Sequence, residues 1–336
     1  MMHQSKKGFS ALFAVTGLMV AFHGIGGEAA AQDAVKFQAN TPLVIGYTAQ
    51  DISNPYWQNY AAGVKAEAAK NDIKVVVADA DAKASQQNQV SGSRNLISQR
   101  ISALIVSPVE PAALPGTISA AHSASIPIVI GDVGATGTYD AFIQSDNRAG
   151  GALAADYMAK KLGSGNVNIA VIDLHPGSTV GVDRVGGFKT ELEKFPNIHI
   201  VSELNGNDAI KEGHDAAANA LAKNPDIKGI YAANDNEAQG AIAAIQEAGK
   251  NPKDFVIVGF DGNAGSVAAI GNGTQTATIA QDPFGQGQLA VKLALQLLRG
   301  QAVAYTDPKT KTIQLPVQLI DSSNLTQFKE ARAGQH

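Results

Sequence analysis

Several acidic side chains and one arginine follow apolar runs of this sequence on their C-terminal side. Asp132 follows "IVIG", Asp261 follows "IVGF", and Arg184 lies within "DLHPGSTVGVDRVGGF". A carboxylate accepts two hydrogen bonds from adjacent hydroxyl groups, and a guanidinium fork donates to hydroxyl or ring oxygens. Together these side chains have the chemistry needed to hold a small polyhydroxylated molecule.

Aromatic and amide side chains extend this set. In "SNPYW", Asn54 is a good N-cap ahead of a proline, and Tyr56 and Trp57 follow directly. A flat ring covers the C–H face of a sugar, while hydrogen bonds serve its polar edges. Asn234 in "NDNEAQGA" and Gln281 in "TATIAQDP" complete the pattern. Taken singly, each residue is equally explained as a cap, a turn residue or a packed ring, so the inference depends on the set.

The elements that must position these residues are short β-branched runs that alternate with amphipathic stretches. Continuous apolar runs such as "ALIVS" and "FVIVGF" predict strands buried on both faces of a parallel sheet. Strands are expected at 43–47, 74–78, 103–107, 126–131, 167–173, 199–203, 229–233 and 255–260, with helices such as 56–70 and 238–248 between them. Such alternation predicts a doubly wound α/β sheet, whose ligands gather outside the carboxyl ends of the strands.

The chain also repeats itself. "AAGVKAEAAKNDIKVVVADAD" from Ala61 resembles "VGGFKTELEKFPNIHIVSELN" from Val185. Each segment runs from a helix into a strand, so we interpret the repeat as two lobes of like topology facing a common cleft. Chance similarity between two amphipathic helices is the alternative.

The N-terminus is expected to lie outside the fold. Lys6 and Lys7 precede an apolar run at 9–22 and a small-residue stretch at 29–31, the pattern of a secretory signal peptide over residues 1–31. A membrane anchor is the alternative, but the run is shorter than the roughly 20 residues that span a bilayer. The pattern predicts that the mature chain is exported and soluble.

Composition excludes several classes of function. A net charge of −4 offers no basic face to nucleic acid or anionic lipid, and the absence of cysteine excludes disulfides, thiol nucleophiles and a lipidated N-terminal cysteine. Metalloprotease, nucleophile-elbow and P-loop motifs are missing, so no catalytic residue, metal or cofactor is predicted. The histidines are scattered; His175 stands near a strand end, where a surface or packing role is favoured over ligand contact.

A family resemblance covers essentially the whole mature chain. The segments "SNPYW", "GDVGAT", "SDNRAGG", "DRVGGF", "AANDNEAQGAIAAI", "VGFDG" and "ATIAQ" resemble, in this order, the periplasmic ribose-binding protein family, the type I sugar-binding proteins of ABC transporters. The resemblance implies an α/β fold of two Rossmann-like lobes joined by a three-strand hinge. It also implies a non-enzymatic receptor located in the periplasm, working as a monomer, that traps a ligand on closure.

Carried across at matching positions, the resemblance implies a set of ligand-binding residues: Asn54, Tyr56, Trp57, Asp132, Arg184, Asn207, Asn234, Asp261 and Gln281. Two positions depart from the ribose type. Val133 stands where that type has Arg, and Asn207 stands where it has an aromatic residue. The departures argue against ribose itself and favour another hydroxyl pattern, that of a branched or open-chain pentose or a tetritol.

The resemblance also predicts the lobe boundaries and the partner. Crossing strands are expected near 145–146, 280–281 and 310–313. They divide the chain into an N-terminal lobe of 41–145 plus 282–312 and a C-terminal lobe of 146–281 plus 313–336. The expected partner is an ABC permease in the inner membrane. A receptor that presents ligand to a chemotaxis or sensor-kinase ectodomain differs only in this partner. A DNA-binding regulator of the lactose-repressor type is disfavoured, because the chain begins with a signal peptide rather than a basic helix-turn-helix.

Overall fold

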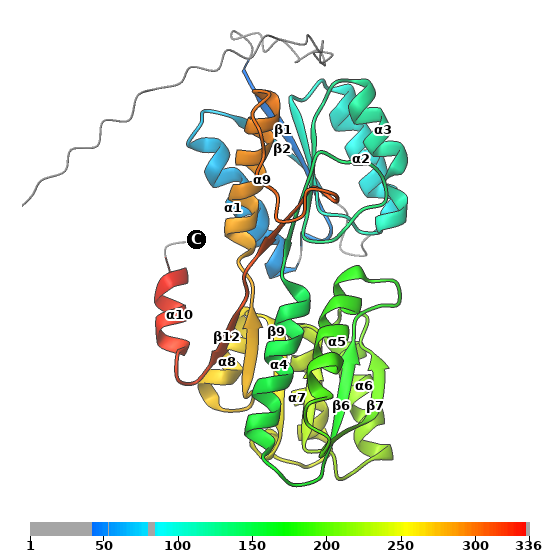
Figure 1. The fold of residues 1–336 in the computed structure, drawn as a ribbon, viewed down its shortest axis with the longest axis vertical. Helices are drawn as coiled ribbons and strands as arrows, with labels where there is room; N and C mark the ends of the chain where they lie inside the picture. Colours follow the sequence, from blue (N-terminus) through cyan, green and yellow to red (C-terminus); the bar gives the residue numbers. More distant parts are fainter. Residues whose placement is uncertain (1–41, 53, 80–84, 334–336) are drawn as a thin grey trace, which may run out of the picture. The chain divides into compact units, whose positions relative to one another are not determined.

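The computed structural model describes residues 42–52, 54–79 and 85–333 (Figure 1). These ranges hold two sheets and the helices that pack on them. The expected signal segment at 1–31 lies outside the described residues.

Two six-stranded sheets carry the fold. Their strand orders are β11-β5-β4-β3-β1-β2 and β12-β10-β9-β8-β6-β7. The strands are β1 Val44–Ala49, β2 Lys74–Asp79, β3 Ala103–Val106, β4 Ile128–Gly131, β5 Ala141–Ser145, β6 Val167–Asp173, β7 Ile198–Asn205, β8 Gly229–Ala232, β9 Val256–Asp261, β10 Ala277–Ala280, β11 Thr312–Leu315 and β12 Gln318–Asp321. Neighbours pair in parallel except β10 with β12, which pair antiparallel. The two orders match strand for strand and differ only in the direction of the edge strands β11 and β12, which confirms an α/β protein with two lobes of like design.

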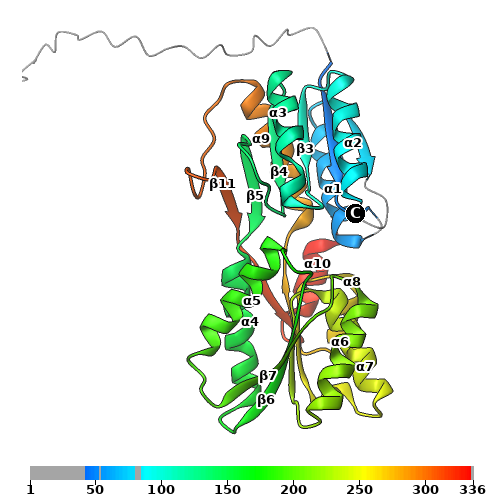
Figure 2. The ribbon, with the colours of Figure 1, turned by 90° about the vertical axis from the view of Figure 1, so that its right-hand side faces the viewer.

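Helices cover both faces of each sheet. They are α1 Pro55–Ala69, α2 Gln86–Ser98, α3 Pro115–Ser123, α4 Asn147–Leu162, α5 Thr179–Leu192, α6 Ile210–Lys223, α7 Asp235–Glu247, α8 Ala264–Asn272, α9 Pro283–Leu298 and α10 Leu325–Arg332, with short 3₁₀ helices η1 Pro111–Ala113 and η2 Pro252–Asp254. Figure 2 shows α4 and α5 on one side of the second sheet and α6, α7 and α8 on the other. None of the helices described has both the length and the apolar character needed to cross a bilayer.

Burial explains why the strands could be recognised in the sequence. Every residue of β3, β4 and β8 is buried, as expected for strands covered by helices on both faces. The eight strands that the sequence predicts are found within a few residues of their predicted bounds. The antiparallel strand β12 has no such apolar run and was not predicted.

Glycines let two helix pairs approach closely at corresponding places in the two lobes. A Cβ on Gly63 of α1 would lie 2.0 Å from the backbone oxygen of Phe284 in α9. A Cβ on Gly187 of α5 would lie 2.1 Å from the backbone oxygen of Arg148 in α4. Gly63 and Gly187 are the residues that the sequence repeat aligns, and β1 and β6, which precede their helices, take the same place in the two sheets. The repeat therefore reflects one packing solution used twice.

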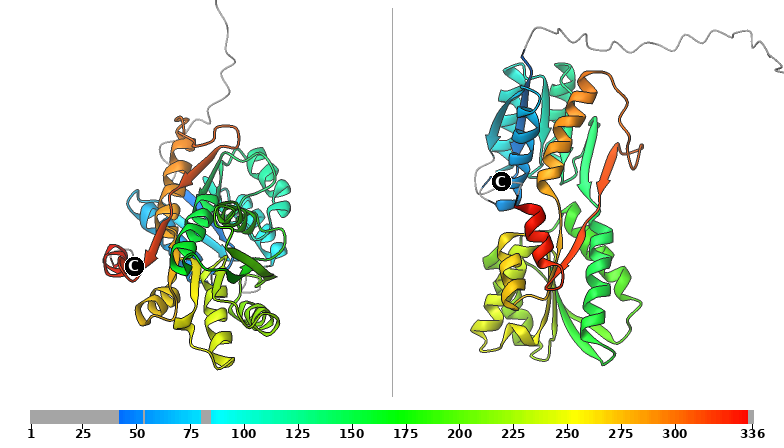
Figure 3. Two further views of the ribbon diagram at one scale, coloured as in Figure 1. Left: turned by 60° about the horizontal axis from the view of Figure 1, so that its bottom comes forward. Right: turned by 90° about the vertical axis from the view of Figure 1, so that its left-hand side faces the viewer.

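The chain passes between the sheets at three places. Strand β5 leads into α4, β10 leads into α9, and β11 leads into β12 (Figure 3). The third passage falls later than the expected 310–313, because β11 pairs with β5 as far as Leu315 opposite Ser145. We therefore propose lobes of 42–145 plus 282–315 and of 146–281 plus 318–333, with residues 316–317 between them.

The glycine contact between α1 and α9 can be tested by adding one methyl group. We expect Gly63→Ala to lower the free energy of unfolding by about 1–3 kcal/mol, because the backbones must separate although alanine is the better helix former. Gly165→Ala is the matched control, since a Cβ there meets no atom within 4 Å. Its effect should stay within about 0.5 kcal/mol. Urea unfolding followed by circular dichroism measures both, and equal stability of the two variants would contradict the close packing.

Candidate functional site

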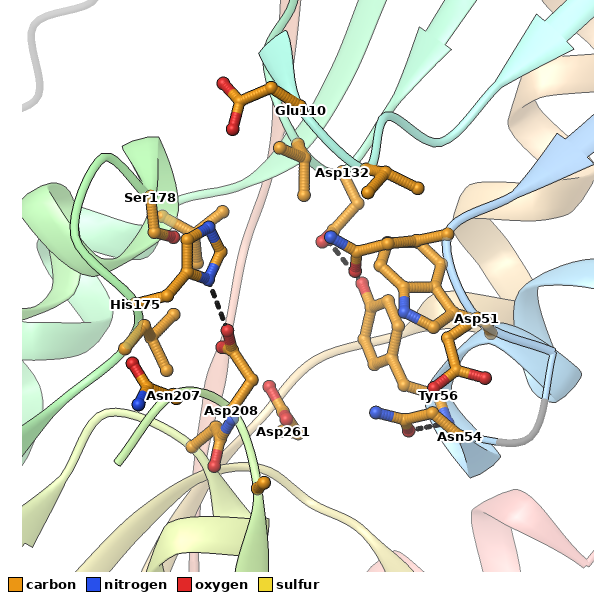
Figure 4. Close-up of a pocket in the computed structure, with 18 of the residues that line it drawn as sticks. Asp51, Asn54, Tyr56, Glu110, Asp132, His175, Ser178, Asn207, Asp208 and Asp261 are labelled. Atoms are coloured by element: carbon orange, nitrogen blue, oxygen red, sulfur yellow. Dashed lines mark hydrogen bonds and ion pairs between the residues drawn. The ribbon is translucent and has the colours of Figure 1, made fainter. Parts of the chain in front are cut away.

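A cavity of about 720 Å³ lies where the carboxyl ends of strands from both sheets meet (Figure 4). Its walls come from the segments after β1 to β4 in the first lobe and from the ends of β6 to β10 and the segments after them in the second. All nine residues named from the sequence line it: Asn54, Tyr56, Trp57, Asp132, Arg184, Asn207, Asn234, Asp261 and Gln281. The fold thus brings together residues from distant parts of the chain.

On the wall of the first lobe, Asp132 is held by a tyrosine. The Tyr56 hydroxyl donates to Asp132 Oδ1 at 2.5 Å and itself accepts from Gln286 Nε2 at 3.1 Å. Gln286 Nε2 also donates to Ser145 Oγ, at 3.0 Å. Burial raises the pKa of Asp132, while the Tyr56 hydrogen bond and the Arg184 charge oppose this. One oxygen of a buried carboxyl is therefore fixed by the protein.

On the wall of the second lobe, Arg184 and Asp261 form an ion pair. Arg184 Nη1 lies 3.1 Å from Asp261 Oδ1, and both side chains are largely buried. Arg184 Nε donates to Asn147 Oδ1 at 2.9 Å, and the guanidinium lies 3.8 Å from the centroid of the Phe260 ring. Gln281 Nε2 donates to Asp261 Oδ1 at 2.6 Å. The guanidinium is therefore pre-oriented at the cavity wall.

The two aspartates occupy equivalent and strained positions. Asp132 follows β4 and Asp261 ends β9, and these strands take the same place in the two sheet orders. Both backbones have positive φ, 65° at Asp132 and 118° at Asp261. A non-glycine residue pays about 1–3 kcal/mol for such a conformation, which persists only where its surroundings enforce it. Here it places a carboxyl on each wall of the cavity (Figure 4).

A brace from the C-terminal helix supports Asp261. Arg332 of α10 donates from Nη1 to the backbone oxygen of Gly262 at 2.9 Å and from Nη2 to the backbone oxygen of Gln281. Its guanidinium stacks over Phe328, 4.4 Å from the ring centroid. Arg332 thus ties the two strand ends that present Asp261 and Gln281. No sequence pattern indicated this role, because Arg332 follows no strand and lies in the last helix.

The two asparagines and the two aromatic residues of the cavity wall also have structural roles, as helix caps and as packed rings. Asn54 accepts a hydrogen bond from Tyr56 N at 2.9 Å, and Asn234 accepts one from Glu237 N at 2.9 Å, so both cap helices while lining the cavity. Tyr56 and Trp57 pack edge to face with centroids 4.8 Å apart, and both are buried. The cap and packing alternatives considered for these residues are therefore compatible with a place at the site.

The family of the chain follows from comparison with known proteins. Residues 45–302 match the model described as a periplasmic binding protein domain. The chain belongs to the periplasmic binding protein family. The ribose import binding protein of Bacillus subtilis (strain 168) is 32% identical over 278 residues, which cover 82% of this chain and 87% of that protein. The family resemblance indicated by the motifs is confirmed.

Solved structures of this family share the fold. An ABC transporter periplasmic solute binding protein from Actinobacillus succinogenes 130z with bound D-allose has a TM-score of 0.79 at 27% identity, covering 85% of this chain and 99% of that one. A solute binding protein from Bacillus halodurans C-125 with bound myo-inositol has a TM-score of 0.77 at 27% identity, covering 86% and 97%. The two-lobed type I fold expected for this periplasmic binding protein is thereby confirmed.

Several polar residues of the cavity were missed by the sequence reasoning. They are Gln50, Asp51, Gln86, Glu110, Ser178, Asp208 and Glu212, together with His175, for which a surface or packing role was favoured. His175 closely follows the predicted strand 167–173, and Glu110 closely follows the predicted strand 103–107, so their positions at strand ends were the available signal. Asp208 lies next to Asn207, which the motifs did indicate. Among the described residues no hydrogen bond joins Ser178 Oγ to His175, so this corner lacks a nucleophile–base contact. The same residues contain no group of three side chains arranged to hold a metal ion.

The buried carboxyls predict an unusual pH dependence of stability. Burial raises the pKa of Asp261 to about 7, although the Arg184 charge opposes this. A carboxyl whose folded pKa exceeds its unfolded value binds more protons in the folded state, so stability rises as pH falls. We expect the unliganded protein to gain stability between about pH 8 and pH 5, and Asp261→Asn to reduce that gain by about 1 kcal/mol or more. Urea unfolding across this range measures it; an unchanged slope in Asp261→Asn would contradict the assignment.

Proposed function

We propose that this protein is a non-enzymatic periplasmic receptor that captures a small sugar or polyol of the pentose, branched-pentose or tetritol class. It closes over this solute by a hinge motion and delivers it to an ABC permease in the inner membrane. The observation that carries the proposal is the pair of equivalent aspartates, Asp132 and Asp261, one on each wall of a single cavity. Each carboxyl accepts hydrogen bonds from adjacent hydroxyl groups, the arrangement that a vicinal diol presents.

The other wall residues suit the same class of molecule. The Arg184 fork donates to ligand oxygens, and the Tyr56–Trp57 pair offers an apolar surface for C–H groups. One relative is named for ribose, and two related proteins were solved with bound D-allose and with bound myo-inositol. All three compounds are neutral polyhydroxylated molecules. These names support a small sugar or polyol as the ligand, but they do not identify which one this protein binds. Val133 and Asn207, both on the cavity wall, support a hydroxyl pattern that differs from that of ribose.

Closure follows from the placement of these groups on two lobes. A molecule bound to one wall gains further hydrogen bonds from the other wall only when the lobes approach, so it favours the closed state. Micromolar affinity requires about −8 kcal/mol. Several hydrogen bonds to charged groups, each contributing about 1.5–3 kcal/mol, supply this after the cost of association. The closed form is then what the permease recognises.

A screen for thermal stabilisation of the chain lacking residues 1–31 tests the class of ligand. It should include pentoses, hexoses, tetroses and their polyols. A compound at about 100 times its dissociation constant adds roughly 2.7 kcal/mol of stability, and we expect at least one to raise the melting temperature by several degrees. Amino acids and sugar acids serve as comparison compounds. No shift with any sugar or polyol would contradict the proposed class.

Substitutions on the wall of the second lobe test the site. We expect Arg184→Ala and Asp261→Ala each to weaken binding of the compound found in the screen at least about tenfold, since each leaves a buried charge without its partner. Lys189→Ala is the matched control, because Lys189 lies in the same helix as Arg184 but pairs with Glu203 on the surface. Calorimetry measures all three. Unchanged affinity in both cavity variants would remove these residues from the site.

Trp57 provides an independent optical test, because it is the single tryptophan of the chain. Its ring lines the cavity and touches Tyr56 at its edge. We expect the emission of Trp57 to change as the compound found in the screen is titrated, with the same dissociation constant as calorimetry gives. A flat titration at saturating concentrations would place the ring away from the ligand.

A further inference from the structure

A histidine–aspartate pair lies on the cavity wall of the second lobe, away from Asp261 and Arg184. His175 Nδ1 and Asp208 Oδ2 are hydrogen-bonded, and both side chains are partly exposed (Figure 4). His175 belongs to the segment between β6 and α5, and Asp208 to the segment between β7 and α6. Neither residue is among the nine that the family motifs indicated.

Both segments are tied together beneath the pair. Gly206 N donates to the backbone oxygen of Asp173 at 2.8 Å, and Asn205 Nδ2 donates to the backbone oxygen of Leu174 at 2.6 Å. These two bonds join the end of β7 to the residues directly before His175. The relative position of the imidazole and the carboxyl is therefore set by the backbone.

Asp208 itself is held in a strained conformation. Asn207 and Asp208 both have positive φ, 51° and 64°. From below, Glu237 Oε1 accepts from Asp208 N at 3.1 Å, and Asn236 Nδ2 donates to the backbone oxygen of Asp208 at 3.2 Å. A Cβ on Gly206 would lie 2.7 Å from Glu237 Cγ, so glycine is required for this contact. Two consecutive strained residues with this much support are typical of a functional position.

The pair leaves one imidazole nitrogen for the cavity. Nδ1 is engaged by Asp208, and no hydrogen bond to Nε2 is found among the residues that the structure describes. The hydrogen bond to the Asp208 carboxylate raises the pKa of His175, burial lowers it, and the charges of Asp208, Glu110 and Asp173 raise it further. Glu110 lies on the cavity wall of the first lobe, and Asp173 ends β6. In the protonated imidazole, Nδ1 donates to the Asp208 carboxylate and Nε2 carries the second proton, so Nε2 acts as a donor; the neutral imidazole keeps its proton on Nδ1 and leaves Nε2 without one.

We propose that His175 is a ligand-binding residue of the second lobe, donating from Nε2 to an oxygen of the bound sugar or polyol, and that Asp208 is its positioning residue. This inference rests on the proposed function and adds to it a second cationic donor. Arg184 and His175 then approach the solute from different parts of one lobe, Arg184 from helix α5 and His175 from the loop directly after β6. A ligand with an acceptor oxygen within reach of both is selected over one without it.

The pH dependence of binding separates this role from a structural one. The probe is the compound with the highest affinity among D-ribose, D-allose, D-apiose, myo-inositol and erythritol, measured by calorimetry from about pH 6 to about pH 9. We expect the affinity of the unmodified protein to fall as His175 loses its proton, because the neutral imidazole keeps its remaining proton on Nδ1 and Nε2 no longer donates. His175→Ala should bind about tenfold more weakly at pH 6 and lose the part of the decline that His175 causes, while any contribution from the Asp261 carboxyl, whose pKa is about 7, stays the same in both proteins.

Conservative variants keep the test independent of folding. His175→Gln retains a neutral donor, so it should recover part of the affinity lost in His175→Ala while keeping the flatter pH profile of that variant. Asp208→Asn removes the carboxylate, so the alkaline decline should begin at a lower pH than in the unmodified protein. His214→Ala is the matched control: this imidazole also pairs with acids, Glu247 and Asp215, but lies in α6 and does not line the cavity. Its pH profile should match that of the unmodified protein.

Three different results would count against His175 as a ligand-binding residue. Binding of a probe with the same pH profile in His175→Ala as in the unmodified protein would overturn the role of His175 and leave the proposed function standing. Failure of every probe, and of the wider screen, would overturn the proposed function and this inference with it. If Glu110→Gln abolished the alkaline decline as completely as His175→Ala, the partner of Nε2 would be Glu110 across the cavity rather than the ligand, which would also overturn the inference.

Discussion

The ion pair between Arg184 and Asp261 is the interaction on which the charge balance of the site depends. Two aspartates, Asp132 and Asp261, are buried at one cavity, and the charge of Asp132 adds to the effect of burial in raising the pKa of Asp261. The Arg184 charge lowers the pKa of both carboxyls against the effect of burial. Its guanidinium is buried and held by Asn147 and the Phe260 ring, so its positive charge stays at a fixed position beside the carboxyls. A mobile lysine could not perform the same task.

Many of the surrounding contacts hold the strand ends that carry these two aspartates. The backbone of Asp261 is strained, and it is held from three directions: Gln281 N donates to its backbone oxygen, Thr278 binds Gly262 N, and Arg332 binds the backbone oxygen of Gly262. Asp132 is strained in the corresponding place of the other lobe and is fixed by Tyr56. Strain that is enforced in this way holds both carboxyls in place without a ligand, and under the proposed function this preorganisation reduces the ordering cost of binding.

Duplication of one design gives the site its symmetry. The close helix contacts at Gly63 and Gly187 fix α1 and α5 against their partners in equivalent ways, so the segments that enter those helices reach the cavity from opposite walls. Gln286, just beyond the second passage between the lobes, donates to Tyr56 and to Ser145 at the first passage. This chain of hydrogen bonds connects two of the passages between the sheets to Asp132.

The fold class, the two lobes and the nine motif residues that line the cavity could all be predicted from the order of amino acids. Buried parallel strands appear as continuous apolar runs, and polar residues at their carboxyl ends must converge because all parallel strands of a sheet end on one edge. The remaining features arise from packing in three dimensions. Strand β11 pairs as far as Leu315 although its alternating residues form no apolar run, and Arg332 braces Asp261 from a helix that follows no site strand. His175 and Asp208 come from separate loops, and their contact depends on a three-dimensional register that spacing along the chain does not encode.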